Sequence, residues 1–281
     1  MADRPAPPPR SESREIAELR RLREEQADLA SAIDLQIQLL QLQRRVQTRV
    51  PLPSIPLDGP GLEAELARGR PILAFETLPI DWSDARFLIR STADAMRTHD
   101  AIEPEDYRRV TDLARDSARL PEMVKNWYES GQPDGPPAAP EVAGLEALIQ
   151  QAMRPFLSRC AEAVMARTVF QGWDAGTCPL CGAEPELAVI TPAADRLLIC
   201  GRCTARWRFD QLTCPYCRNA DRSRITSFAT RDGLYRLYAC DVCQRYLKAY
   251  DGRHASRPVM PAVDTIATLP LDAAAVQRGY R

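Results

Sequence analysis

Four Cys-x-x-Cys pairs in the C-terminal part of the chain constrain its fold more than any other feature. The pairs are Cys178 with Cys181, Cys200 with Cys203, Cys214 with Cys217, and Cys240 with Cys243. Two residues between cysteines let one tight turn direct both sulfurs at the same ion, and a hairpin of about 20 residues returns a second turn to complete a tetrahedral site. The gaps here are 18 and 22 residues. The pattern therefore predicts two four-thiolate metal sites, built by two tandem copies of one small module.

Each predicted module has about 40 residues, too few to be stable through apolar burial alone. Structural zinc contributes roughly 10–16 kcal/mol of apparent binding free energy in comparable sites, which suffices to fold such a unit. Disulfides or free thiols are the alternative interpretation. Eight cysteines in four matched pairs, in a chain without a recognisable export signal, instead favour metal ligation. We expect two metal ions per chain.

Sequence order assigns four cysteines to each site. The first set is Cys178, Cys181, Cys200 and Cys203. The second set is Cys214, Cys217, Cys240 and Cys243. An interleaved arrangement, in which the first pair joins the third and the second joins the fourth, requires longer crossings and stays open.

The identity of the metal, zinc or iron, is also open, because four-thiolate tetrahedra suit both. A rubredoxin-like iron turn prefers glycine directly after its second cysteine. Only Cys181 is followed by glycine, at Gly182. The residues after the other three pairs are Thr204, Arg218 and Gln244, which favours zinc at the second site.

Three further side chains of metal-binding type lie outside the four pairs. Cys160 falls within a helical pattern, and we interpret it as a small buried hydrophobic residue. His99 and His254 lie in predicted loops or helix ends. With eight thiolates available, neither histidine is needed as a ligand.

The chain before residue 173 is predicted to be an all-α domain. Residues 1–10 contain four prolines and are expected to be a disordered tail. Residues 11–130 form the helical domain, residues 131–140 a Pro/Gly-rich linker, and residues 141–172 a helix that completes the domain. The expected helices are Ser11–Val50, Leu62–Arg68, Asp81–His99, Pro104–Leu120 and Glu141–Phe170.

From Trp173 onward short β-type runs alternate with the cysteine turns. Residues 173–212 are expected to form the first metal ribbon, residues 213–253 the second, and residues 254–281 a C-terminal tail. The expected strands are Leu187–Thr191, Arg196–Ile199, Arg206–Phe209, Ile225–Phe228, Tyr235–Tyr238 and Tyr246–Tyr250. The predicted fold class is α+β, an N-terminal all-α domain followed by two tandem rubredoxin-like or zinc-ribbon modules.

The composition indicates in which compartment the protein lies and which classes of partner it binds. No apolar signal segment and no run of 18 apolar residues occurs, so we expect a cytoplasmic protein without a membrane span. The 37 basic and 38 acidic residues nearly cancel, which disfavours nucleic acid as a partner. Between Trp173 and Asp251 the count is 11 Arg or Lys against 9 Asp or Glu, so a nucleic-acid-binding ribbon ranks last among the alternatives.

Nothing in the sequence indicates an enzyme. Phosphate-binding glycine loops and nucleophile–base motifs are both missing from the sequence, so no catalytic residue is predicted. The aromatic residues around the cysteine turns form either a partner-binding surface or packing over the metal sites, and we favour packing for Trp207 and Phe209. A redox or electron-transfer module remains an alternative if one site holds iron.

The residue order from Trp173 to Arg281 resembles the formate dehydrogenase accessory proteins, the FdhE family. The likeness rests on Trp173, on the four cysteine pairs with Gly182, Pro185 and Trp207, and on Tyr246-Leu247-Lys248 after the last pair. It also includes the tail Asp264-Thr265-Ile266-Ala267-Thr268-Leu269-Pro270-Leu271-Asp272 and the ending Gly279-Tyr280-Arg281. The family often has two adjacent acids where this chain has Asp264 and Thr265. Helix capping and solvation are our interpretation of Asp264 and Asp272.

The resemblance implies a cytoplasmic assembly factor for respiratory formate dehydrogenase. Its expected partner is the catalytic subunit of that enzyme, before export, and a homo-oligomer is a further possibility. Members of the family carry two rubredoxin-like metal modules beside a helical domain, and the eight paired cysteines take that role here.

Overall fold

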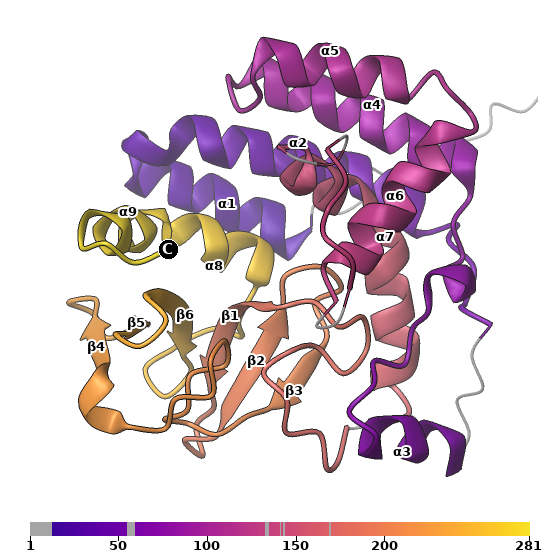
Figure 1. The fold of residues 1–281 in the computed structure, drawn as a ribbon. Coiled ribbons are helices and arrows are strands. Elements are labelled where there is room, and N and C mark those ends of the chain that lie inside the picture. Colours follow the sequence, from indigo (N-terminus) through magenta and orange to yellow (C-terminus); the bar gives the residue numbers. More distant parts are fainter. Residues whose placement is uncertain (1–12, 55–59, 133–134, 141, 143, 169) are drawn as a thin grey trace, which may run out of the picture.

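The computed structural model describes residues 13–54, 60–132, 135–140, 142, 144–168 and 170–281 (Figure 1). Its helices α1–α7 are Arg14–Glu25, Ala30–Gln47, Pro60–Ala67, Trp82–Thr98, Pro104–Leu113, Arg119–Ser130 and Glu146–Met165. Strands β1–β6 are Pro185–Ile190, Arg196–Cys200, Arg206–Arg208, Ile225–Ala229, Tyr235–Cys240 and Arg245–Asp251. Helices α8 and α9 are Pro261–Ala267 and Leu269–Gln277. The predicted α+β class is confirmed, whereas the expected tail at residues 1–10 lies outside the described residues.

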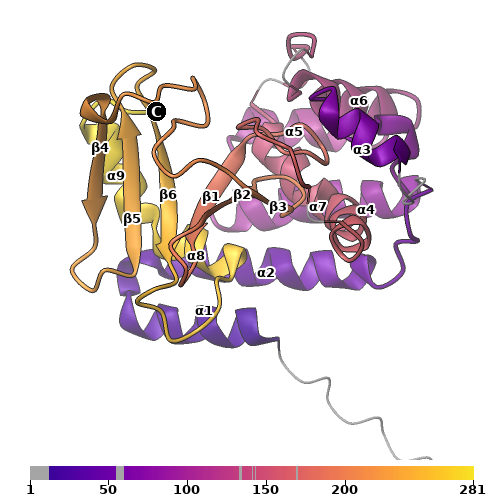
Figure 2. The ribbon, with the colours of Figure 1, turned by 90° about the horizontal axis from the view of Figure 1, so that it is seen from below.

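The first predicted helix, Ser11–Val50, is in fact a helical hairpin. Gln26 leaves the helical conformation, with φ −133° and ψ 79°, so α1 ends and α2 runs back beside it (Figure 2). The ion pairs of Arg23 with Asp34 and of Arg44 with Glu15 join the two helices. The prediction of one helix was wrong because no glycine or proline marks the reversal.

The prediction of one helix over Pro104–Leu120 was also wrong, because the helix is interrupted between Leu113, the end of α5, and Arg119, the start of α6. The Asp116 carboxylate accepts hydrogen bonds from the backbone N–H groups of Ala118 and Arg119 and so organises the start of α6. The last helix before the sheet, α7, is shorter than the expected Glu141–Phe170. It lies against α2 and α4 and presents Ile149, Phe156 and other apolar residues to the main core.

The two cysteine modules share one six-stranded sheet, in the order β3-β2-β1-β6-β5-β4 (Figure 2). Each module contributes three antiparallel strands. The halves meet where β1 runs parallel to β6, with Leu187 opposite Lys248 and Ile190 opposite Asp251. The modules are therefore joined by backbone hydrogen bonds into one structural unit.

The segment expected to be a C-terminal tail folds into α8 and α9, which lie between the helical region and the sheet (Figure 1). Ala262 and Val263 of α8 pack with Leu19 of α1 and Ile33 of α2. Ala275 of α9 packs on Leu237 and Ala239 of β5. The end of the chain is thus a packed layer that covers the second module.

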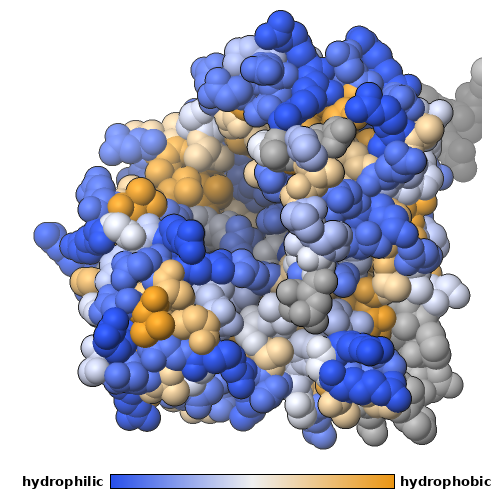
Figure 3. All heavy atoms as spheres, viewed as in Figure 1, coloured by the Kyte–Doolittle hydropathy of each residue, from blue (hydrophilic) through white to orange (hydrophobic). Residues whose placement is uncertain are grey.

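The main apolar core runs from the helices into the first module without a break. Leu148 and Phe156 of α7 belong to the same cluster of buried side chains as Cys178, Cys181 and Trp207. The face in Figure 3 is mostly hydrophilic, with apolar residues in scattered patches. Within the described residues, no helix has both the length and the apolar character needed to cross a membrane.

Candidate metal centres

All four Cys-x-x-Cys turns have the same backbone form. The residue after the second cysteine donates its N–H to the carbonyl of the first cysteine, over 2.9 Å at Gly182, 3.2 Å at Thr204, 3.0 Å at Arg218 and 2.9 Å at Gln244. These four residues have φ values of 75°, 61°, 62° and 55°. Such a left-handed backbone favours glycine and costs other residues about 1–2 kcal/mol. Because the turns match even without glycine, its absence after three pairs does not distinguish the two sites.

The first four cysteines converge in the interior of the protein. Their sulfur atoms lie 3.6 Å apart between Cys178 and Cys203, 3.4 Å between Cys181 and Cys200, and 3.6 Å between Cys181 and Cys203. All four sulfurs lie within 4.8 Å of one another. None of these residues is more than 1% exposed.

The second four cysteines form an equivalent group nearer to the surface. Their sulfurs also lie within 4.8 Å of one another, with 3.7 Å between Cys214 and Cys243 and 3.7 Å between Cys217 and Cys240. Cys214 and Cys240 are buried, whereas Cys217 and Cys243 are partly exposed.

The sulfur spacing of both groups fits a tetrahedral metal site. A Zn–S bond of about 2.3 Å implies edges of about 3.8 Å in an S₄ tetrahedron, whereas a disulfide brings two sulfurs to about 2.05 Å. Each group could therefore hold one metal ion, for which the donor set suits zinc and iron alike. The grouping in the structure follows sequence order and not the interleaved arrangement.

Arg202, inside the second turn of the first group, is a buried cation that sequence reasoning missed. Its Nη1 and Nη2 donate to the carbonyls of Tyr128 and Trp127 over 3.0 and 2.9 Å, and its guanidinium lies 4.0 Å from the Trp127 ring. Burial lowers the pKa of Arg202, and the nearby cysteine sulfurs oppose this shift. Four thiolates around a divalent ion carry two net negative charges, one of which this guanidinium would offset. The available signal was its position between Cys200 and Cys203.

Both turns of the first group are hydrogen-bonded to the helical region. The backbone N–H groups of Ile72 and Leu73 donate to the carbonyls of Pro179 and Leu180 over 3.0 and 2.8 Å. In the other turn, the carbonyl of Gly201 accepts from Gln150 Nε2 over 3.1 Å and from Arg154 Nη2 over 2.8 Å. The first group therefore lies at the junction between helices and sheet.

The turns of the second group contact the sheet region and the end of the chain. The Tyr216 hydroxyl donates to the Pro185 carbonyl over 3.3 Å. The guanidinium of Arg245 lies 3.7 Å from the Tyr216 ring. In the other turn, the Tyr280 hydroxyl donates to the Asp241 carboxylate over 2.6 Å. None of these contacts reaches helices α1–α7.

The remaining candidates from the sequence occupy structural positions. Cys160 is buried in α7, and burial raises the pKa of its thiol to about 12, which makes it unreactive. His99 ends α4, with its Nε2 3.3 Å from Gln38 Oε1. Neither His99 nor His254 belongs to a potential metal-binding group within the described residues. The packing interpretation of Trp207 and Phe209 is supported, since they are 1% and 6% exposed.

The expected solvation of Asp264 and Asp272 is contradicted for Asp264, which is fully buried. Its carboxylate accepts from the Met260 N–H over 2.7 Å, but no side chain caps the first turn of α8, so the capping interpretation is not confirmed. It also accepts from the Tyr235 hydroxyl over 2.7 Å and from Arg257 over 2.6 Å. Asp272, which is partly exposed, pairs with Lys248 over 2.6 Å. These acids hold the C-terminal helices on the sheet, a tertiary role that local sequence could not reveal.

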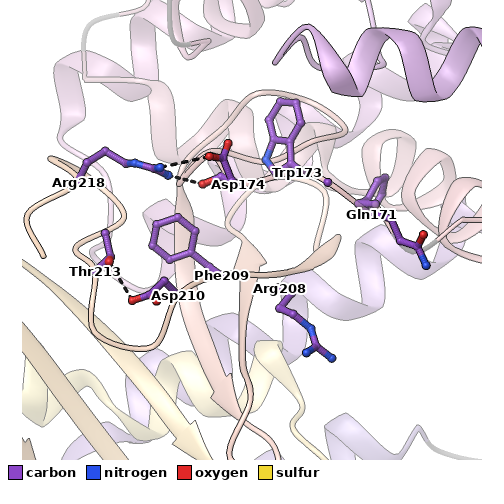
Figure 4. Close-up of a pocket in the computed structure, with 10 residues that line it drawn as sticks. Gln171, Trp173, Asp174, Arg208, Phe209, Asp210, Thr213 and Arg218 are labelled. Atoms are coloured by element: carbon purple, nitrogen blue, oxygen red, sulfur yellow. Dashed lines mark hydrogen bonds and ion pairs between the residues drawn. The ribbon is translucent and has the colours of Figure 1, made fainter.

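A cavity of about 680 Å³ opens beside the second group (Figure 4). Thr213 and Arg218, on either side of the first turn of that group, form part of its wall. Arg218 pairs with Asp174, and the Thr213 hydroxyl donates to Asp210 over 2.9 Å. Backbone and hydroxyl hydrogen bonds lower the pKa of Asp210. Among the described lining residues, the carboxylates of Asp174 and Asp210 are thus already bound by neighbouring donors.

Comparisons with known proteins agree with this architecture. No family model matches the chain. A protein named FdhE homolog from Haemophilus ducreyi is 24% identical over 193 residues, and the match covers 68% of this chain but only 58% of that relative. Protein FdhE of Escherichia coli is 30% identical over 107 residues, which span 37% of this chain and 34% of the relative.

A solved structure shares the fold over most of the chain. The crystal structure of the FdhE protein from Pseudomonas aeruginosa matches with a TM-score of 0.61 over 95% of this chain and 91% of that one, at 22% identity. The chain is therefore similar in sequence to FdhE proteins, spans little more than half of the Haemophilus ducreyi relative, and shares the fold of the Pseudomonas aeruginosa FdhE protein.

Proposed function

We propose that the chain is a cytoplasmic, non-enzymatic accessory protein that assists the assembly of formate dehydrogenase by binding its catalytic subunit. The observation that carries the proposal is the pair of tetra-cysteine groups in one sheet under a helical cover, in a chain similar to FdhE proteins. The eight cysteines of Cys178–Cys203 and Cys214–Cys243 would hold the two metal ions. These ions supply cross-links that fix the small modules.

The cavities of the described residues support a binding role over a catalytic one. In the cavity beside the second group, the carboxylate of Asp210 accepts from the Leu212 N–H over 3.0 Å and organises its own loop. Its lowered pKa makes it a weak general base near neutral pH. Protein recognition needs no such base, and a rigid two-layer body provides a stable surface for it.

The test is co-purification with the catalytic subunit of formate dehydrogenase from cells that lack their own accessory protein. Metal-loaded wild-type protein should retain the subunit and restore formate dehydrogenase activity. The double variant Cys217→Ser/Cys243→Ser should lose both, whereas Cys160→Ala, which removes the ninth cysteine, should keep both. Absence of the subunit from the metal-loaded wild-type eluate would refute the proposal. Light scattering of the same sample would report the oligomeric state.

A redox module is the second candidate, favoured by the partial exposure of Cys217 and Cys243. Electron transfer requires iron and an accessible site. Elemental analysis after anaerobic purification separates the two functions. Zinc alone, without visible thiolate-to-iron absorption, would eliminate the redox candidate and leave the accessory role intact.

Nucleic-acid binding has little support from the arrangement of the arginines. Arg202 is buried against Trp127, and Arg208 and Arg218 pair with Asp195 and Asp174. They therefore do not present one open basic surface of the kind that contacts phosphates. A gel-shift assay with DNA and RNA at low salt should show no binding.

A further inference from the structure

The two tetra-cysteine groups have the same turns but very different surroundings. All ten residues from Cys178 to Ala183 and from Cys200 to Cys203 are buried. In the second group, Val242 at the tip of one turn is 53% exposed, and Cys217 and Cys243 are partly exposed. The second group therefore lies at the protein surface, whereas the first is enclosed.

The two groups also differ in the parts of the protein to which their turns are hydrogen-bonded. In the first group, the turns bond to the loop at Ile72 and Leu73, to α7 through Gly201, and to α6 through Arg202. Opening either turn breaks contacts between the helical region and the sheet. In the second group, the turns bond to Pro185, Asp174 and the chain end, and Tyr216 packs against the main core. Opening them breaks none of the hydrogen bonds that join the first group to the helices.

From these observations we propose that the two sites have separate roles: the Cys178 group fixes the helical region to the sheet, whereas the Cys214 group exchanges its ion with the surroundings. The inference rests on the metal-binding part of the proposed function. Cys217 and Cys243, the partly exposed residues of the group, would be the first to be replaced as ligands, one at a time, by the nitrogen or thiolate donors of a chelating acceptor. Each thiolate so released would take up a proton from water and leave hydroxide.

A buried arginine lies beside each group, so charge alone does not distinguish them. Arg202 is 8% exposed, and Arg196 is 4% exposed and donates to the carbonyl of Thr213, next to Cys214, over 3.1 Å. Their partners differ: those of Arg202 lie on α6, whereas those of Arg196 lie in the loop before Cys214. Only the arginine of the first group therefore connects its turn to the helical region.

The experiment is release of zinc from fully loaded full-length protein to excess 4-(2-pyridylazo)resorcinol, followed by absorbance. Two phases of one ion each are expected. The first should be at least about tenfold faster than the second, because a local opening costs less free energy than separation of an interface. In Cys217→Ser/Cys243→Ser only the slow phase should remain.

Hydrogen–deuterium exchange during release identifies the site without any variant. After the fast phase, amides at Ile72, Leu73 and in α6 should stay protected, and protection should fall only with the slow phase. A single phase, or loss of helical protection with the first ion, would overturn the inference. Uptake of fewer than two zinc ions would refute the metal sites themselves. Two-phase release without partner retention would refute only the accessory function.

Discussion

Replacement of Asp264 by asparagine tests how the C-terminal helices are held. The carboxylate lies at a junction of three elements, with Tyr235 on β5, the Met260 N–H at the start of α8, and Arg257 as its donors. Arg257 also pairs with Glu18 of α1 over 2.8 Å, which connects residues 239 positions apart. Asparagine keeps the shape of the side chain but removes its charge and turns one acceptor into a donor.

The expected loss can be worked from these contacts. Hydrogen bonds to a charged group contribute about 1.5–3 kcal/mol, and removal of one partner of a buried ion pair costs about 3–5 kcal/mol. The Arg257 side chain is 19% exposed and keeps Glu18, so its charge is not left entirely uncompensated. We therefore expect Asp264→Asn to lower the free energy of unfolding by about 3 kcal/mol.

Urea denaturation of the zinc-loaded protein, followed by circular dichroism, measures this change. The matched control is Asp112→Asn, which removes an acid from the pair with Arg115, whose side chains are 73% and 67% exposed. That substitution should lower the free energy of unfolding by less than about 1 kcal/mol. If Asp264→Asn were no more destabilising than Asp112→Asn, the buried network would not hold the C-terminal helices as argued.

Three further predictions follow from single contacts. Hydrogen bonds from Arg253 and Arg236 lower the pKa of the Asp251 carboxyl group. The loss of unfolding free energy in Asp251→Asn should therefore be greatest above about pH 4, the pKa of an aspartate in the unfolded chain, and should shrink as the pH falls below that value. Urea titrations at several pH values measure this dependence. Gly182 and Gln244 both have a left-handed backbone, which glycine adopts more easily than other residues. In thermal denaturation, Gly182→Ala should therefore lower the free energy of unfolding by about 1–2 kcal/mol, whereas Gln244→Gly should leave it unchanged or raise it by up to about 1 kcal/mol. Arg202→Met should accelerate the slow zinc phase and leave the fast phase unchanged.

The chemistry of the site could be predicted from local sequence. A Cys-x-x-Cys turn determines where its two sulfurs point, so sequence order favoured the grouping that the structure has, although the interleaved arrangement stayed open until the structure excluded it. The β-type runs between the turns were placed within a few residues of β1–β6. Helix α4 was also anticipated, since Asp81 caps its start and His99 its end. These features depend on neighbours in sequence.

Features that depend on distant neighbours were not predictable in the same way. No local pattern distinguishes two separate ribbons from one sheet, because the joining pair of β1 and β6 is set by tertiary contacts. Arg202 was counted with surface arginines, since sequence does not show that Trp127 and Tyr128 cover it. The helices after Gly252 did have a signal that was overlooked, namely Pro261 and Pro270 in the first turns of α8 and α9.

The topology explains why only the second group is free to serve as an exchange site. The parallel pair of β1 and β6 prevents the two modules from separating, and the bond of Arg257 to Glu18 closes the helical region over them. Any motion that opens the first group must therefore break the core shared by Leu148, Phe156 and Cys181. The second group lies nearer to the surface, and its turns bond to Asp174, to Pro185 and to the end of the chain, with Tyr216 packed against the edge of the main core. Exposure and freedom to open thus coincide in the second group, where Cys217 and Cys243 are partly exposed, because the shared core encloses only the first group.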